Sequence, residues 1–238
     1  MAGKNKGAAG GDGDSLAQVE EIANNAAGAL KVAQFKAWLY SYFHPYQACE
    51  KEKKGASLSG SASTFALTGI VNAVAMIIAT LILAAFTMFA GLPMLIGAFA
   101  ALVIYPILSV VGGFIMSAIY YVVAKVLGGK GGFMEQTYCM ALVSGGTVLM
   151  MAPFSILQAL PVIGGLFGLL VMAVGIYGLI SQYRTVRAVH SLSQLRAIVV
   201  IVVPLILLAL AIATFLAALM VALGVGAVAG GMGSGYGY

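Results

Sequence analysis

The stretch 197–223 constrains this chain more than any other, because it is a long apolar run without a single charged residue. As a helix rising ~1.5 Å per residue it would be about 40 Å long, enough to cross a hydrocarbon core of ~30 Å. The stretch just before it, 184–196, carries three arginines and a histidine. An uncharged run beside a basic flank is typical of a membrane-spanning helix, so we predict an integral membrane protein.

The composition supports this class. Hydrophobic residues make up 62% of the 238 residues and charged residues only 8%, whereas soluble domains carry about 25% charged residues. The net charge of +5 would also suit a nucleic-acid-binding protein. The basic residues lie beside apolar runs, however, where they set the orientation of the spans. The bilayer is therefore the expected partner, and nucleic acid is not. The first residues, MAGKNKGAAGGDGD, lack the apolar core of a cleavable signal peptide, so insertion would rely on the internal spans.

Four further apolar runs precede the one at 197–223. We predict membrane spans at about 65–89, 94–126, 138–160, 162–183 and 197–223. The second run is longer than one crossing needs, so it must tilt, bend at Pro106 or Gly112-Gly113, or project from the membrane. The predicted fold class is all-α integral membrane, with a five-span domain over 58–223. We expect disorder at 1–14 and a flexible Gly/Tyr tail at 224–238.

The segment 15–57 predicts an amphipathic helix and a linker ahead of the first span. Ser15 and Gln18 have the spacing of a capping box, and Pro45 predicts that the helix ends near His44. The last turns are rich in aromatic residues, including Phe35, Trp38 and Tyr42. Aromatic rings favour the headgroup region, so we predict that these three residues lie on the membrane surface. The alternative is a helix packed against its own protein.

The positions of the basic residues decide the number of spans. All 12 lysines and arginines lie before the first span, at 125–130 or at 184–196. Five spans with the N-terminus inside place all of them in the cytoplasm, as the positive-inside rule requires. A sixth span, made by splitting the second run at Gly112-Gly113, would move both later basic stretches outside. We therefore predict five spans and an external C-terminus.

The sequence offers no pattern for a catalytic, cofactor or metal site. His190 has no acidic partner nearby, because the only carboxylate after residue 52 is Glu135. Cys49 and Cys139 are isolated thiols without a metal or redox spacing. The glycine-rich GGKGGF stretch lacks the spacing of a phosphate-binding loop. Gly164 and Gly168 form a G-x-x-x-G motif, which favours close helix packing, either within the chain or in a homodimer.

Several short motifs from Gly128 onward resemble the Yip1 family of five-span membrane proteins. They are a glycine-rich turn after the second span, prolines in and after the third span, a tyrosine in the fourth and the stretch R-x-x-R-A-V-H-S-L-S-Q-L-R-A. The resemblance covers about residues 64–223. The residues singled out for this resemblance or for helix packing are Gly129, Gly131, Phe133, Pro153, Pro161, Gly164, Gly168, Tyr177, His190, Ser193 and Arg196.

The resemblance also bears on function. Eukaryotic members of the family bind Rab-type GTPases and act in vesicle traffic, but their acidic D-L-x-G-P stretch is not found here. The chain is more similar to prokaryotic members, which implies a location in the cytoplasmic membrane. We therefore expect a non-enzymatic protein that organises or shapes the membrane or scaffolds other membrane proteins, with self-association as a further option. The alternative is a transporter or channel subunit for a neutral or lipid-like solute.

Overall fold

The computed structural model describes residues 33–87 and 92–222, and every regular element in these two ranges is a helix. The predicted helix start at Ser15, the disordered stretch 1–14 and the tail 224–238 lie outside the described residues. Residues 33–43 are helical, and His44 interrupts the helix before α2 (Pro45–Glu52) and the short 3-10 helix η1 (Lys53–Gly55). The break lies where the sequence predicted it, because a proline disfavours helical geometry in the residue before it.

Five long helices follow and form the membrane domain. They are α3 (Leu58–Thr87), α4 (Leu92–Val126), α5 (Phe133–Leu157), α6 (Gly164–His190) and α7 (Gln194–Ala222). Each is long and apolar enough to cross a bilayer, which confirms the predicted five-span, all-α class. The helix α4 runs through Pro106 and Gly112-Gly113 without interruption, so the second apolar run is one helix and not two.

The helices at the basic end are longer than the sequence suggested. The predicted spans leave 184–196 as a connection of thirteen residues between them, but α6 continues as a helix to His190. The connection to α7 is therefore the short turn 191–193, in which Ser191 adopts a left-handed conformation with φ 52°. The arginines thus project from helix ends rather than from a loop, and this fixes their positions.

The long helix α4 crosses α3 at very close range. A Cβ atom added to Gly69 of α3 would lie 2.6 Å from the Cα atom of Pro106 in α4. A Cβ atom on Gly113 would lie 2.7 Å from the ring of Phe65. Small residues at both points allow the backbones to approach, which is how helices commonly associate in lipid. As one helix, α4 would be about 50 Å long, so it must lie tilted or extend beyond a bilayer of ordinary thickness.

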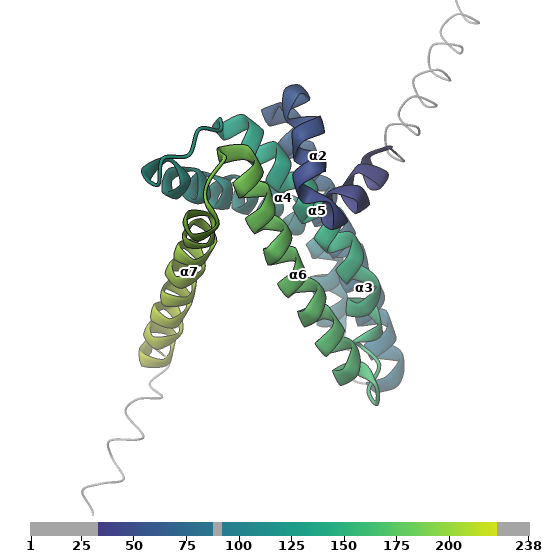
Figure 1. Cartoon of the computed structure of the whole chain (residues 1–238). Coiled ribbons are helices and arrows are strands. Elements are labelled where there is room, and N and C mark those ends of the chain that lie inside the picture. Colours follow the sequence, from purple (N-terminus) through teal and green to yellow (C-terminus); the bar gives the residue numbers. More distant parts are fainter. Residues whose placement is uncertain (1–32, 88–91, 223–238) are drawn as a thin grey trace, which may run out of the picture.

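The main apolar core lies where α4, α5, α6 and α7 converge at the basic end. Its buried members are Tyr120, Ala124, Met140, Val186, Leu192, Ala197, Val200 and Ile201. The contribution of α7 comes from its first turns, with Leu205 as its last residue packed on this core. From residue 206 to 221 every side chain of α7 is exposed. Figure 1 shows the consequence, since α7 stands apart from α6 over most of its length.

Candidate functional site

Two stretches that carried the sequence motifs meet at the basic end of the molecule. The connection between α4 and α5 (127–132) packs against the end of α6 and the start of α7 (190–196), and we call this contact the loop junction. The Lys130 amide donates a hydrogen bond to the His190 carbonyl at 3.2 Å. The Arg196 guanidinium donates to the Leu127 carbonyl at 3.3 Å. These bonds bring together motif residues that lie more than fifty positions apart in sequence.

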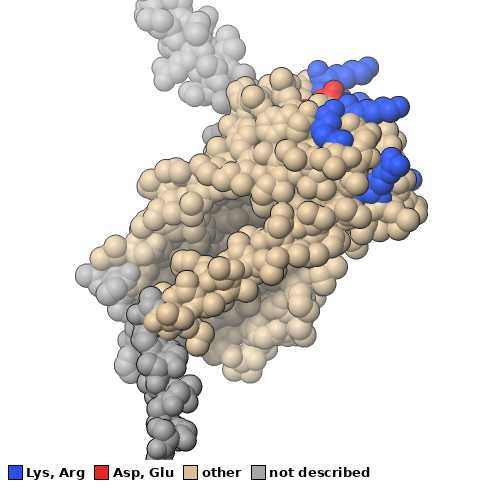
Figure 2. Space-filling view, turned by 90° about the vertical axis from the view of Figure 1, so that its left-hand side faces the viewer, with Lys and Arg blue, Asp and Glu red and all other residues tan. Residues whose placement is uncertain are grey.

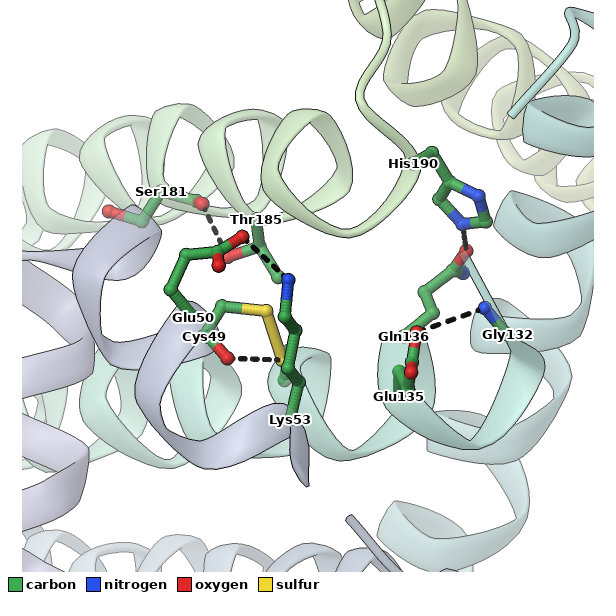
Figure 3. Close-up of a disulfide and its surroundings, with 10 residues drawn as sticks. Cys49, Glu50, Lys53, Gly132, Glu135, Gln136, Ser181, Thr185 and His190 are labelled. Atoms are coloured by element: carbon green, nitrogen blue, oxygen red, sulfur yellow. Dashed lines mark hydrogen bonds and ion pairs between the residues drawn. A yellow bond between two sulfur atoms is a disulfide. The ribbon is translucent and has the colours of Figure 1, made fainter. Parts of the chain in front are cut away.

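The centre of the loop junction is a buried pair formed by His190 and Gln136. His190 Nε2 lies 2.5 Å from Gln136 Oε1 (Figure 3). Gln136 Nε2 donates to the Ser117 carbonyl at 2.8 Å, which orients the amide so that its oxygen faces the imidazole. Since an amide oxygen can only accept, Nε2 of His190 carries the proton. The other ring nitrogen, Nδ1, is buried and has no hydrogen-bond partner within the described part of the chain.

This geometry gives His190 a structural role. Its side chain is fully buried at 0% exposure, and its partner is an amide and not a carboxylate. Glu135, the nearest carboxylate in sequence, instead accepts a bond from the Gly132 amide at 3.1 Å and caps α5. A second proton on the imidazole would leave a buried donor without an acceptor, so the neutral ring fits this position.

The glycines of GGKGGF permit the close approach of the two stretches. A Cβ atom on Gly129 would lie 2.7 Å from His190 Nδ1, and one on Gly131 would collide with Val189. The backbone of this stretch is therefore occupied by contacts with α6. Phe133, the first residue of α5, packs edge-on against Tyr121 at 5.5 Å between ring centroids. Of the three residues that the sequence singled out here, Gly129 and Gly131 lie in the loop junction and Phe133 follows directly after it.

Five exposed basic side chains lie on the connection and helix ends at this end of the molecule. We call this set the basic rim; its members are Lys125, Lys130, Arg184, Arg187 and Arg196. Figure 2 shows lysines and arginines gathered at one end of the molecule, with the long apolar surface free of them. Lys125 also lies 5.4 Å from the centroid of the Tyr121 ring, a cation–π distance. Ser193 is exposed beside the rim, and its carbonyl accepts the Ala197 amide at 3.0 Å as α7 begins.

A second packed region lies before the first span. Residues 33–55 fold against α5 and α6, and we call them the N-terminal clasp. Trp38 is 0% exposed, and its ring fills a notch at Gly145, where an added Cβ would lie 2.5 Å from the indole. The Tyr42 hydroxyl donates to the Val174 carbonyl at 3.0 Å. Ser181 donates to the Tyr42 carbonyl at 2.9 Å.

These contacts change the interpretation of the aromatic residues. Trp38 and Tyr42 touch protein and are buried, so the expectation that they present their rings to the membrane surface is wrong. The alternative, a helix packed on its own protein, describes both. Phe35 is 37% exposed and lies edge-on to Trp38 at 5.2 Å, so its contact with the membrane surface stays a prediction. Tyr177 of α6 packs on Tyr42 at 4.9 Å. Burial, and then Tyr177, raises the pKa of the Tyr42 hydroxyl.

A disulfide between Cys49 and Cys139 ties the clasp to α5 (Figure 3). Our expectation that these cysteines are isolated thiols is wrong. The two residues are 90 positions apart, so no local spacing could reveal the bond, and their Cα atoms lie 5.4 Å apart, a normal separation for a disulfide. Beside it, Lys53 bonds to Glu50 at 2.7 Å, and this bond raises the pKa of the Lys53 amine.

The remaining motif residues lie at the opposite end, around the turn between α5 and α6. A Cβ on Gly164 would collide with the Gln158 carbonyl, and one on Gly168 would lie 3.1 Å from Gln158 Nε2. The G-x-x-x-G motif therefore serves packing within this chain. Pro153 near the end of α5 and Pro161 in the turn are also at this end, away from the loop junction. Both are exposed.

A polar cavity of about 340 Å³ lies between α3, α4, α5 and α6. Its polar lining residues are uncharged: Thr68, Asn72, Ser109, Ser117, Tyr120, Ser144 and Gln182. The Tyr120 hydroxyl lies 3.5 Å from Gln182 Oε1 across it. Among the described residues no group of histidines, cysteines and carboxylates has the arrangement of a metal site. The cavity can offer hydrogen bonds but no charge.

Comparison with known protein families matches the Yip1 domain to residues 39–216. No curated protein and no solved structure matches the chain. The match begins inside the N-terminal clasp, whereas the motifs that carried the resemblance in the sequence begin near residue 64. It also covers the loop junction and the packed first half of α7.

Proposed function

Because the chain belongs to the Yip1 family of membrane proteins, we propose that it acts without catalysis, as a membrane scaffold whose basic rim binds an acidic segment of a protein partner. The observation that carries this proposal is the loop junction. Backbone and side-chain bonds lock two connections together and hold the exposed cations of the rim at fixed positions. A fixed array of like charges favours a complementary anionic partner.

The charge of this end is poorly balanced within the described part of the chain. The carboxylates there are Glu50, Glu52 and Glu135. Glu50 pairs with Lys53, and Glu135 caps α5. No ion pair links a carboxylate to the basic rim in the described residues. The cations of the rim therefore remain available to a partner.

The chemistry of the site supports a non-enzymatic role. The one histidine at the loop junction is buried against an amide, and the cysteines near it form a disulfide. General acid–base catalysis needs a titrating group within reach of a substrate. A binding role needs only the exposed cations.

We further propose that the basic end faces the cytoplasm, with the N-terminus inside, in the cytoplasmic membrane of a prokaryote. The support is the distribution of all 12 lysines and arginines. The disulfide is a competing signal, because disulfides persist mainly in oxidising compartments. A C-terminal reporter that is active only in the cytoplasm should stay silent. A strong reporter signal would overturn this orientation.

The scaffold proposal is tested by crosslinking in cells, followed by purification in native lipid. The wild type should recover a companion protein in a fixed ratio, and the double variant Lys130→Glu, Arg184→Glu should lose it. The double variant Lys36→Glu, Lys51→Glu makes the same charge change on the clasp, outside the basic rim, and should keep the companion. Equal recovery by both variants, or no companion with the wild type, would contradict the proposal.

The polar cavity favours a second candidate function, a pathway for a neutral solute. Hydrogen-bonding groups from four helices face one space of about 340 Å³ without a charged residue. Polar groups in a membrane domain are costly and often mark a binding site. A substitution that tests this candidate must lie in the cavity lining, which excludes the glycines of the α6 motif region, Gly165 and Gly168. Gly112 lines the cavity, and a Cβ atom added there would meet open space.

The test of this second candidate is solute flux in proteoliposomes. Gly112→Leu should fill the cavity and abolish flux of small neutral polyols or amides. Gly97→Leu lies in the same helix at a position that is also open and outside the cavity, so it should leave flux unchanged. Absence of flux with the wild type, or equal flux in both variants, would exclude a pathway through this cavity.

A further inference from the structure

An apolar groove of about 490 Å³ runs between α6 and α7. It is lined by Ile176, Leu179, Ile180 and Tyr183 of α6 and by Gln194, Ile198, Ile201 and Val202 of α7. We propose that this groove binds one acyl chain of an anionic phospholipid, whose phosphate lies against Arg187.

The groove has a polar end and an apolar end. Its polar members, Tyr183 and Gln194, are those nearest the turn 191–193, while the rest of the lining is aliphatic. Residues three and four apart share one face of a helix. Ile180, Tyr183 and Arg187 therefore form one stripe along α6, which leads from the apolar lining to a cation.

Arg187 is available to a ligand. Its side chain is exposed, and within the described part of the chain it makes no hydrogen bond or ion pair. Arg196, by contrast, bonds to the Leu127 carbonyl and lies two residues after Gln194, on the other side of α7. Arg187 is thus the cation placed to complete the groove with a charged end.

The shape and charge of the groove favour a lipid over another helix. The walls meet at the short turn between α6 and α7, so the groove narrows toward its basic end. A transmembrane helix is about 10 Å across with its side chains and cannot enter the narrow end, whereas an acyl chain can. The combination of an aliphatic wall and a cation complements an anionic amphiphile. A second copy of this chain would satisfy the wall but leave Arg187 unpaired.

The test uses the full-length protein in nanodiscs made of equal parts phosphatidylglycerol and phosphatidylcholine. The lipids that stay bound after release from the disc are counted by native mass spectrometry. The wild type should retain phosphatidylglycerol in preference to phosphatidylcholine. Arg187→Gln should lower that preference about fivefold, because one basic side chain near an anionic lipid contributes about 1 kcal/mol. Lys130→Gln removes an equal charge outside the groove and should preserve the preference.

Two further variants test the acyl-chain part of the site. Ile198→Trp fills the groove and should remove the retained lipid of both kinds. Leu207→Trp changes an exposed residue of α7 outside the groove and should retain lipid like the wild type.

The proposal is overturned if Arg187→Gln and Lys130→Gln behave alike, or if Ile198→Trp still retains lipid. It is also overturned if the wild type is released as a dimer that Ile198→Trp dissociates, since the groove would then hold a second copy. A companion protein is absent from the nanodisc, so this outcome is independent of the scaffold proposal.

Discussion

The N-terminal clasp and α7 both pack on α6, but they are held to the protein in opposite ways. The clasp is polar and aromatic, yet Trp38 is fully buried and a disulfide ties the segment to α5. The helix α7 is the most hydropathic of the five candidate spans, yet its residues 206–221 are exposed along their whole length. Thus α7, whose sequence predicts a membrane span most strongly, is less buried within the protein than the polar clasp.

The difference shows that hydropathy and packing report different properties. In a bilayer, an apolar side chain gains little by leaving lipid for protein, so a long apolar run predicts the environment of a helix and not its neighbours. Burial within the protein instead follows shape. Gly145 provides a notch, and the indole of Trp38 fills it. Four experiments test this difference between the clasp and α7.

The largest effect is expected from Trp38→Ala. Removing a fully buried tryptophan typically costs about 3–5 kcal/mol of unfolding free energy. Phe215→Ala, on the exposed half of α7 at 67% exposure, should change stability by less than about 0.5 kcal/mol. Unfolding in lipid nanodiscs measures both. If the two variants lose similar stability, the contrast between the regions fails.

The disulfide should have the next largest effect. Cys49→Ser with Cys139→Ser should lower stability by about 2–4 kcal/mol, because the bond restricts the unfolded chain. Digestion under native conditions should then cut the clasp first, since it has lost its covalent tie, while α7 should be cut at the wild-type rate. Two free thiols in the protein isolated from cells would show instead that the clasp is held without the bond.

A pair of glycine variants tests shape alone. Gly145→Ala places a methyl group 2.5 Å from the Trp38 ring, and such overpacking costs about 1–3 kcal/mol. Gly175→Ala is a matched change in α6, where an added Cβ meets nothing within 4 Å. Only the first variant should lower the unfolding midpoint. A loss in Gly175→Ala of the same size would mean that glycine acts through the backbone and not through the notch.

The last prediction, of a size similar to that of Gly145→Ala, concerns the attachment of α7. Gln136→Leu leaves His190 Nε2 buried without its acceptor, which costs about 1–3 kcal/mol. The loss should be accompanied by greater cleavage in the turn 191–193, because His190 anchors that turn to α5. Gln47→Leu changes an exposed glutamine and is the control. Unchanged cleavage in Gln136→Leu would show that the apolar core alone holds α7.

The sequence was sufficient for the parts of the fold that depend on one helix at a time. Apolar length gave five helices, and Pro45 marked the break after residue 43. The contacts between distant residues could not be predicted. The Cys49–Cys139 bond and the Gln136–His190 pair each join positions more than fifty residues apart. The amphipathic pattern of the clasp was visible, but it could not distinguish a lipid surface from a protein surface, since both accept an aromatic face.

Tryptophan fluorescence can show whether the clasp is part of the protein interior and the end of α7 is not. Trp38 is the one tryptophan in the chain, so its fluorescence in vesicles of brominated phospholipid reports whether the clasp touches lipid. We expect little quenching for the wild type. We expect strong quenching for the double variant Trp38→Phe, Phe215→Trp, whose indole lies on the exposed half of α7. Strong quenching of Trp38 in the wild type would show instead that the clasp lies on the membrane surface.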